Sequence, residues 1–268
     1  MKIASWNINS VRLRAPIVLD FLNSHQPDVL CLQETKTPDE HFPHDAFKGT
    51  PYKHIHMHGM KGYNGVAILS KIPFTKQDIH HRACKEDCRH IAVTLEPKGY
   101  GKPVTIHNLY IPAGGDEPDR ALNEKFDHKL NFVEELTDWF PKHHKKDEAV
   151  IAVGDFNIAP LEHDVWSHKQ LLKVVSHTPI EVEKLTEMQK AMNWIDTARH
   201  FVPEDQKLYS WWSYRSKDWL ASNRGRRLDH IWVTPILKEN LKSHNIYTDP
   251  RGWDRPSDHV PIITEFSF

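Results

Sequence analysis

Short apolar runs recur along this chain of 268 residues, and most are bounded by Pro, Gly, Asn or Asp, which favour turns. Runs of this kind are typical of β-strands, whereas few of the intervening segments show the 3.6-residue periodicity of a helix. Many strands with few helices between them favour mixed sheets over a doubly wound parallel sheet. The pattern therefore predicts a mixed α/β sandwich.

The expected elements can be placed along the chain. The expected strands are Lys2–Trp6, Asp28–Gln33, Tyr52–His56, Gly65–Leu69, His90–Leu95, Val104–Leu109, Ala149–Gly154, Leu208–Trp212, Leu228–Val233, His244–Thr248 and Ile262–Phe266. The expected helices are Pro16–Ser24, Ala121–Phe140 and Glu181–Met192. Pro16 suits a helix start, because proline lacks an N–H that the first turn would leave unpaired.

Two segments in different halves of the chain resemble each other. The runs Ile3–Asn9 and Ile151–Asn157 each read as an apolar strand that ends in polar groups. This repetition predicts two stacked sheets, related as approximate repeats, which share a cleft at one edge. No linker rich in glycine or serine divides the chain, so we expect residues 1–268 to form a single domain.

Composition narrows the class of protein. Apolar residues make up 39% of the chain, enough for a sizeable core, and no run is long enough for a transmembrane helix. The first residues lack the layout of a secretory signal, and three cysteines form no disulfide framework, so we expect a cytoplasmic protein. The net charge of −1 does not exclude a nucleic-acid binder, because such binding depends on a local basic face.

Histidines and cysteines offer two weaker metal hypotheses. The alternating His54, His56 and His58 share one face of a strand, for which solvation is favoured over a metal site. Cys84 and Cys88 with the histidine at 90 resemble part of a zinc site, but no fourth ligand accompanies them, so unpaired thiols are favoured. The histidines at 143 and 144 lie at a lysine-rich helix end and are expected to be solvated.

Polar groups interrupt or end four of the apolar runs. They are Gln33 with Glu34, Asp155 with Asn157, Asp229 inside the run 228–233, and Asp258 with His259 before the last strand. A carboxylate in a buried strand costs free energy unless it is paired or holds a metal. Asp and Asn also cap turns, but four such places in one chain weaken that explanation. Together they supply oxygen ligands for a hard cation and groups for acid–base catalysis.

The polar segments resemble motifs of the endonuclease/exonuclease/phosphatase superfamily. The superfamily motifs are Trp6–Asn9, Leu32–Thr35, Gly154–Asn157 and Ser257–His259. Finer motifs resemble the exonuclease III family of abasic-site endonucleases, namely Gln33–Lys36, Asn108–Pro112, Tyr209–Ser216 and Asn223–Asp229. The resemblance covers nearly the whole chain and implies a four-layer α/β sandwich of two mixed β-sheets flanked by helices.

The resemblance also implies a role for each polar residue. The implied metal ligands are Glu34, Asn9, Asp258, Asp155 and Asn157, with Mg²⁺ as the cofactor and Mn²⁺ as a substitute. Asp155 would activate the attacking water, while Asn7 and Asn157 would orient the phosphate and the water. Tyr110 would contact the scissile phosphate, and His259, paired with Asp229, would stabilise its charge. Some family members carry Asp where Asn9 stands, so a weaker metal contact is expected there.

For the substrate, Trp211, Trp212 and Leu228 resemble the family's apolar pocket for a flipped-out abasic sugar, which excludes a base. Alternation along a strand predicts that at least one of the two tryptophans belongs to the core instead. Basic residues suited to tracking phosphates surround them, namely Arg215, Lys217, Arg224, Arg226 and Arg227. Related enzymes often have an aromatic or aliphatic residue at the position of Arg226, so the pocket wall is expected to differ here. The small and acidic segment Ala113–Asp116 also lacks the family's basic intercalating residue.

These residues imply a Mg²⁺-dependent DNA phosphodiesterase of base excision repair. Its expected substrates are duplex DNA with abasic sites, cut on their 5′ side, and duplex 3′ ends, trimmed by a monomeric 3′-to-5′ exonuclease. A phosphoinositide or phospholipid phosphoesterase is the alternative, against which the segment 211–229 argues. A non-catalytic binding module is disfavoured, because it has no need to keep buried charges.

Overall fold

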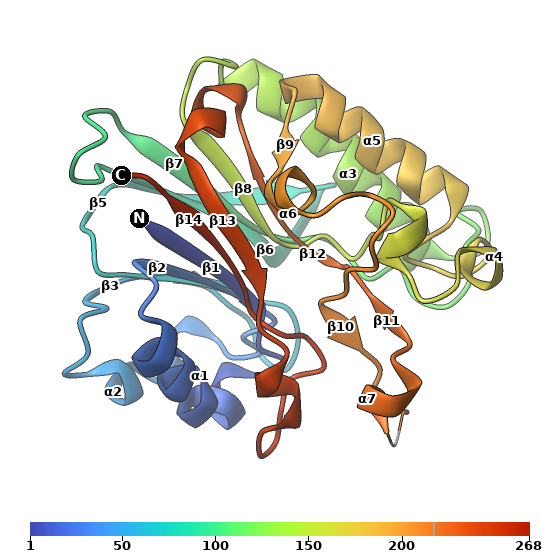
Figure 1. Ribbon diagram of the computed structural model, residues 1–268, viewed down its shortest axis with the longest axis horizontal. Coiled ribbons are helices and arrows are strands. Elements are labelled where there is room, and N and C mark those ends of the chain that lie inside the picture. The colour runs from blue at the N-terminus through green and yellow to red at the C-terminus, as the bar shows by residue number, and fades with distance from the viewer. Residues whose placement is uncertain (217) are drawn as a thin grey trace.

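The computed structural model describes residues 1–216 and 218–268 (Figure 1). Lys217, which the sequence placed in the basic cluster, lies outside the described residues. Two six-stranded sheets stack on each other, with the strand orders β13-β14-β1-β2-β4-β3 and β5-β6-β7-β8-β12-β9. A two-stranded ribbon of β10 and β11 extends beside the second sheet (Figure 1).

The strands have the following bounds. The first sheet contains β1 (Lys2–Asn7), β2 (Val29–Gln33), β3 (His54–His58), β4 (Val66–Ser70), β13 (Leu241–Ile246) and β14 (Ile262–Phe266). The second contains β5 (Phe74–Arg82), β6 (Lys85–Leu95), β7 (Val104–Tyr110), β8 (Val150–Asp155), β9 (Ile195–Asp196) and β12 (Asp229–Val233). The ribbon pairs β10 (Trp211–Trp212) with β11 (Gly225–Arg226).

Helices cover the outer face of each sheet (Figure 1). The helices are α1 (Val11–His25), α2 (His44–Phe47), α3 (Glu124–His143), α4 (His168–Leu171), α5 (Pro179–Met192), α6 (Thr197–Phe201) and α7 (Trp219–Ser222). Residues of α1 and α2 pack on the first sheet, and residues of α3 and α5 pack on the second. The expected four-layer sandwich with two mixed sheets is confirmed. No helix within the described ranges is long and apolar enough to cross a membrane.

The two sheets repeat one strand pattern. In the first, β14 is antiparallel to β1, β1 is parallel to β2, and β4 and β3 follow as antiparallel neighbours. In the second, β12, β8, β7, β6 and β5 follow in the same order with the same relative directions. The strands β1 and β8 are therefore equivalent, as the resemblance between residues 3–9 and 151–157 predicted.

The two-residue alternation of strands decides which side chains enter the space between the sheets. On β1, Ile3 packs in the core between the sheets, so Asn7, four residues on, points the same way. On β8, Ile151 and Val153 pack in that core, so Asp155 points inward too. The inward row of β8 is apolar until the strand end, whereas the inward row of β1 becomes polar at Ser5 and continues to Asn7. The polar ends meet at one edge of the sandwich.

The predicted elements differ from the observed ones mainly at their starts. Helix α1 begins at Val11, so Pro16 lies inside it and not in its first turn. Helix α3 begins at Glu124, because the side chain of Asn123 accepts a hydrogen bond from the backbone N–H of Lys125 at 3.0 Å. Strand β5 was not predicted, since its side chains are mostly polar and exposed. Alternation of apolar residues is weak on such an edge strand.

Candidate active site

The side chain of Asn7 joins carboxylates from the two sheets. At the end of β1, its Nδ2 donates to Glu34 Oε1 and to Asp155 Oδ2, both at 2.8 Å. Glu34 follows β2 of the first sheet, and Asp155 ends β8 of the second. The hydroxyl of Ser257 donates to the backbone carbonyl of Asn7 at 2.6 Å and ties the loop before β14 to the same place. Polar groups of both sheets therefore meet at this edge, where the sequence predicted a shared cleft.

His259 and Asp229 form the predicted pair. His259 Nδ1 lies 2.9 Å from Asp229 Oδ2, which also accepts a hydrogen bond from the hydroxyl of Ser210 at 2.6 Å. This contact leaves Nε2 of His259 facing Asp155 Oδ2 at 3.7 Å. Burial alone would lower the pKa of His259, but the carboxylates of Asp229 and Asp155 outweigh it and raise the pKa to about 10. The ring is therefore an imidazolium that presents an N–H to the cleft.

Asp155 is a buried carboxylate held by three donors. It accepts hydrogen bonds from Asn7, from the backbone N–H of Asn157 at 2.9 Å and from Asn157 Nδ2 at 3.1 Å. Burial raises the pKa of Asp155 to about 7 and Asp229 adds to the rise, although the imidazolium of His259 opposes it. A carboxylate with a pKa near neutrality can accept and return a proton under ordinary conditions.

Asn157 keeps one free atom for the cleft. Its Nδ2 donates to Ile111 O at 2.9 Å and to Asp155, which uses both of its N–H groups. Its backbone carbonyl accepts a hydrogen bond from Lys129 Nζ at 2.8 Å. The amide oxygen is thus the atom with which Asn157 can hold a water or a cation.

Glu34, Asn9 and Asp258 form the candidate metal centre. Lys36 Nζ lies 2.8 Å from Glu34 Oε2 and 2.5 Å from Asn9 Oδ1. Asp258 Oδ1 accepts a hydrogen bond from Asn9 Nδ2 at 3.2 Å, and its Oδ2 accepts one from Trp211 Nε1 at 2.9 Å. Carboxylate and amide oxygens suit a hard divalent cation, and the ammonium of Lys36 shows that Glu34 and Asn9 already face one positive charge.

The ionisation of Glu34 agrees with that role. Burial would raise the pKa of Glu34, but Lys36 and a hydrogen bond from Asn7 outweigh it and lower the pKa below its ordinary value. Asp155, Asp229 and His259 also lie close enough together to suggest a metal cluster. We place no metal on that trio, because an imidazolium has no lone pair to give. No role was predicted for Lys36, although a cation two residues after a partly buried acid is a usable signal.

The backbone at this edge is strained. Asn9, Glu34, Lys36 and Asn157 have φ angles of 49°, 52°, 52° and 53°, in the left-handed region. Asparagine tolerates that region, whereas glutamate and lysine rarely adopt it. Residues held in such conformations cluster at functional sites. The strained backbone of Glu34 and Lys36 therefore points to the same functional site as the cluster of carboxylates does.

Tyr110 ends β7 beside the carboxylates, as its motif predicted. The guanidinium of Arg89 lies 4.6 Å from the centre of its ring and donates to its backbone carbonyl at 3.2 Å. Burial and the charge of Glu34 raise the pKa of Tyr110, so the phenol keeps its proton and can donate. Arg89 was not predicted, because its contact with Tyr110 depends on the pairing of β6 with β7.

Two predicted substrate-binding residues do not face the cleft. Trp212 is buried, its Nε1 donates to Asn223 Oδ1 at 3.1 Å, and its ring packs in the core of the ribbon. Arg227 is fully buried and ion-paired with Asp164 at 2.8 Å and Asp196 at 2.6 Å. Trp212 is thus the core tryptophan that strand alternation predicted, whereas the prediction that Arg227 binds substrate was wrong. Trp211, Leu228 and Arg226 do lie together on the cleft side.

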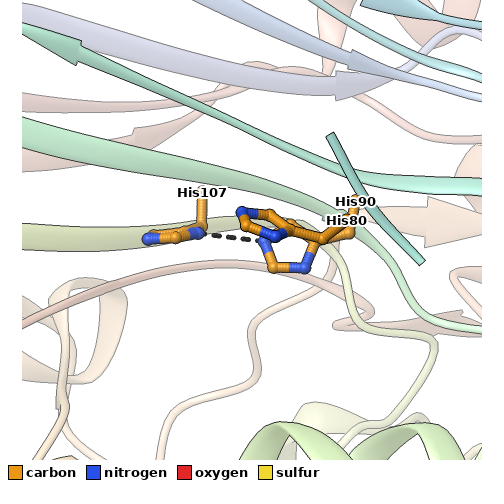
Figure 2. A group of neighbouring side chains, drawn as sticks. All are labelled: His80, His90 and His107. Atoms are coloured by element: carbon orange, nitrogen blue, oxygen red, sulfur yellow. Dashed lines mark hydrogen bonds between the residues drawn. The ribbon is translucent and has the colours of Figure 1, made fainter. Parts of the chain in front are cut away.

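A second histidine cluster lies under α3 and is explained without a metal. Figure 2 shows His80, His90 and His107, which come from β5, β6 and β7. Arg82 Nε donates to His90 Nδ1 at 3.1 Å, so His90 Nε2 carries the proton in its 2.9 Å contact with His107 Nδ1. His107 Nε2 then donates to His144 at 2.9 Å. Every ring nitrogen of His90 and His107 has a partner, and burial lowers the pKa of both.

The structure corrects two expectations about histidines and weighs further against the zinc site that the sequence already disfavoured. His144 contacts His107 and is not the solvated helix end that the sequence predicted. His90 is used by Arg82 and His107, so it does not complete a zinc site with Cys84 and Cys88. The row His54, His56 and His58 is half-buried and not a solvated face, since β5 lies beside it and His56 Nε2 contacts Asp78 O at 3.1 Å.

Comparison with known proteins identifies the family. The family model described as "Endonuclease/Exonuclease/phosphatase family" matches residues 4–259, a span that holds every residue of the site. The chain belongs to this family. One family relative, the exodeoxyribonuclease III of Haemophilus influenzae, is 33% identical over 99% of this chain and 100% of its own length.

Solved structures of the family have the same fold over their whole length. An AP endonuclease from Archaeoglobus fulgidus superposes with a TM-score of 0.91 at 30% identity, with full coverage of both chains. The 3′ phosphatase NExo from Neisseria, bound to a product DNA hairpin, superposes with a TM-score of 0.89 at 30% identity, also with full coverage of both chains. The resemblance that the sequence motifs indicated is confirmed.

Proposed function

We propose that the chain is a divalent-metal-dependent DNA phosphodiesterase of base excision repair, which cuts 5′ to abasic sites and trims the 3′ ends of duplex DNA. One observation carries the proposal. The amide of Asn7 joins the metal-binding carboxylate Glu34 to the carboxylate Asp155, beside the imidazolium of His259. A base, a cation site and a fixed positive charge at one point suit the attack of water on a phosphodiester. Family relatives named as exodeoxyribonuclease III and AP endonuclease support the DNA substrate.

Asp155 is the proposed general base. Its carboxylate takes a proton from a water that the amide oxygen of Asn157 holds, and the water oxygen attacks phosphorus. His259 donates its Nε2 hydrogen to a non-bridging phosphate oxygen, where negative charge builds up in the transition state. Asp229 keeps the ring oriented through Nδ1. Tyr110, with its proton retained, donates a second hydrogen bond to the phosphate.

Glu34, Asn9 and Asp258 are the proposed ligands of the metal, with Mg²⁺ as the natural ion and Mn²⁺ as a substitute. Their oxygen atoms fit a hard cation, and Asp155 and Asn157 lie on the opposite side of Asn7. A bound divalent ion neutralises charge on the phosphate and on the leaving 3′ oxygen. Lys36 would have to withdraw from Glu34 and Asn9 when the ion enters.

Trp211 and Leu228 are the proposed walls of a sugar pocket, while the exposed Arg215 and Arg224 track phosphates. All the proposed site residues come from one chain, so we propose a monomer. We propose that it acts in the cytoplasm, where the free cysteines stay reduced. A phosphoinositide substrate is not favoured, because the ribbon presents flat aromatic and basic side chains suited to a polynucleotide.

Asp155→Asn tests the proposal. We expect turnover of a duplex with one abasic-site analogue to fall by about 10²–10⁴-fold, because the amide cannot accept the proton. Duplex binding, measured by fluorescence anisotropy, should stay near that of the wild type. Asp205→Asn, at an exposed carboxylate, is the matched control and should keep its turnover.

The same assay distinguishes the proposed function from its alternatives. Cleavage by the wild type should require Mg²⁺ or Mn²⁺ and stop with EDTA, on the abasic duplex or on a duplex with a recessed 3′ end. Near-normal turnover by Asp155→Asn would refute the role of that residue. Hydrolysis of soluble inositol phosphates without cleavage of either duplex would replace the DNA substrate by the phospholipid alternative.

A further inference from the structure

Arg226 lies beside the proposed sugar pocket and is fixed at both of its faces. It pairs with Trp211 across the β10–β11 ribbon, and its guanidinium lies 5.2 Å from the centre of the Trp211 ring. Its Nη1 donates to Val175 O at 3.0 Å and to the hydroxyl of Ser176 at 2.7 Å. The side chain thus spans from the ribbon to the segment that precedes α5. Among the described residues, no other charged side chain connects the ribbon to the segment that precedes α5.

Ser176, the hydrogen-bond partner of Arg226, is itself held rigidly. Ser176 has a φ of 90°, a strained value for serine, and its N–H donates to both carboxylate oxygens of Glu181 at 2.9 Å. Glu181 forms a fully buried ion pair with Lys129, whose Nζ also donates to the carbonyl of Asn157. A continuous set of contacts therefore runs from the catalytic loop to Arg226. Strain that the surroundings hold in place marks a functional constraint.

Trp211, the aromatic partner of Arg226, borders the candidate metal centre. Trp211 packs with Leu228 in a small apolar cluster and, at its other edge, donates to Asp258. The guanidinium of Arg226 therefore lies where the apolar cluster meets the metal-binding edge. Its Nε is buried and has no partner among residues 1–216 and 218–268, although burying an unpaired N–H costs stability. The position is better explained by function than by packing.

We propose that Arg226, latched to Ser176, closes the sugar pocket and makes duplex 3′ ends the preferred substrate over internal abasic sites. The inference rests on the proposed function. An internal abasic nucleotide must leave the helix and enter the space beside Trp211 and Leu228, which requires Arg226 to break both of its hydrogen bonds. A terminal 3′ nucleotide reaches the catalytic edge without full extrusion. The latch therefore slows incision at internal abasic sites and does not slow the trimming of 3′ ends.

The test compares kcat/KM on two duplexes, one with an internal tetrahydrofuran abasic analogue and one with an undamaged recessed 3′ end. The wild type should cut the 3′ end faster. Arg226→Ala should raise the ratio of abasic incision to 3′ trimming by about tenfold or more, the discrimination that the shape of a pocket can supply. Ser176→Ala removes the latch but keeps the arginine and should raise the ratio less. Arg215→Ala, an exposed arginine on the same ribbon, should weaken both reactions and leave the ratio unchanged.

The outcomes separate the two hypotheses. If the wild type cleaves neither duplex, the proposed function fails. If it cleaves DNA but neither Arg226→Ala nor Ser176→Ala changes the ratio, the latch is refuted and the proposed function stands. An equal fall in both rates for Arg226→Ala would assign Arg226 to general DNA contact and would also refute the latch. Retained 3′ trimming shows that each variant is folded, and Ser176→Ala decides the question should Arg226→Ala not fold.

Discussion

At the scale of single residues, Asn9 is the weakest member of the candidate metal centre. It offers a neutral amide oxygen next to the carboxylates of Glu34 and Asp258, so it contributes no charge to the binding of a cation. Lys36 donates to the same oxygen. The proposed site would therefore hold its metal with fewer charged ligands than its layout permits, and we expect the residue at position 9 to set the metal affinity.

Asn9→Asp should lower the Mg²⁺ concentration that gives half-maximal cleavage by about tenfold, because a third negative charge beside Glu34 and Asp258 strengthens cation binding. The measurement is a Mg²⁺ titration of duplex cleavage, with isothermal titration calorimetry of the free protein beside it. Asn193→Asp, at an exposed helix end, is the control and should behave as the wild type. Weaker Mg²⁺ binding by Asn9→Asp would mean that Lys36 holds the new carboxylate and keeps the metal out.

At the scale of elements, the parallel pair β7–β8 sets the position of Asp155. Gly154 has a φ of 142°, and a Cβ at this position would lie 1.9 Å from the carbonyl oxygen of Leu109. The close approach of the two strands therefore requires glycine. Asp155 comes next in the chain, so any shift that relieves such a clash also moves the carboxylate away from Asn7.

Gly154→Ala should destabilise the protein by about 2–4 kcal/mol, since backbone atoms must move to admit the methyl group. Urea unfolding followed by circular dichroism measures the change, and turnover should fall as well. Gly252→Ala is the matched control, because a Cβ at residue 252 meets no atom within 4 Å. Equal stability of the two variants would show that β7 and β8 are not held as closely as described.

At the level of strands, some features of the candidate site could be predicted from the sequence and others could not. The polar ends of β1, β2 and β8 were predictable, because an acid or amide after an apolar run stands out against the cost of burying it. The sides on which Trp212 and Arg227 lie were not, since they depend on the pairing of two-residue strands that leave no periodicity in the sequence. Arg89 and the latch of Arg226 were missed for a similar reason, because their partners are distant in the chain.

At the scale of the whole molecule, the two sheets share one core and one site. Ile3 of the first sheet and Val153 of the second pack in the same apolar layer, and Asn7 bridges carboxylates of both. A site divided between two sheets works only if the sheets do not move apart. We therefore propose that residues 1–268 unfold as a single domain, as the sequence predicted.

Native-state hydrogen exchange tests this proposal. The central strands β1 and β8 should exchange with the same free energy, equal to that of global unfolding, because neither sheet can expose its inner face alone. The edge strands β13 and β5 should exchange faster. Urea unfolding should show one transition by circular dichroism and by tryptophan fluorescence. Different exchange energies for β1 and β8 would mean that the sheets are separate folding units.

The repeated strand pattern has a consequence for protein synthesis. In each sheet, the strand that lies antiparallel to β1 or β8 comes late in the chain, as β14 and β12 do. The residues that come with them, Asp229, Asp258 and His259, complete the catalytic edge. A ribosome must therefore translate nearly the whole message before the proposed nuclease can act. Unfinished or prematurely terminated chains would be harmless to the chromosome near which they are made.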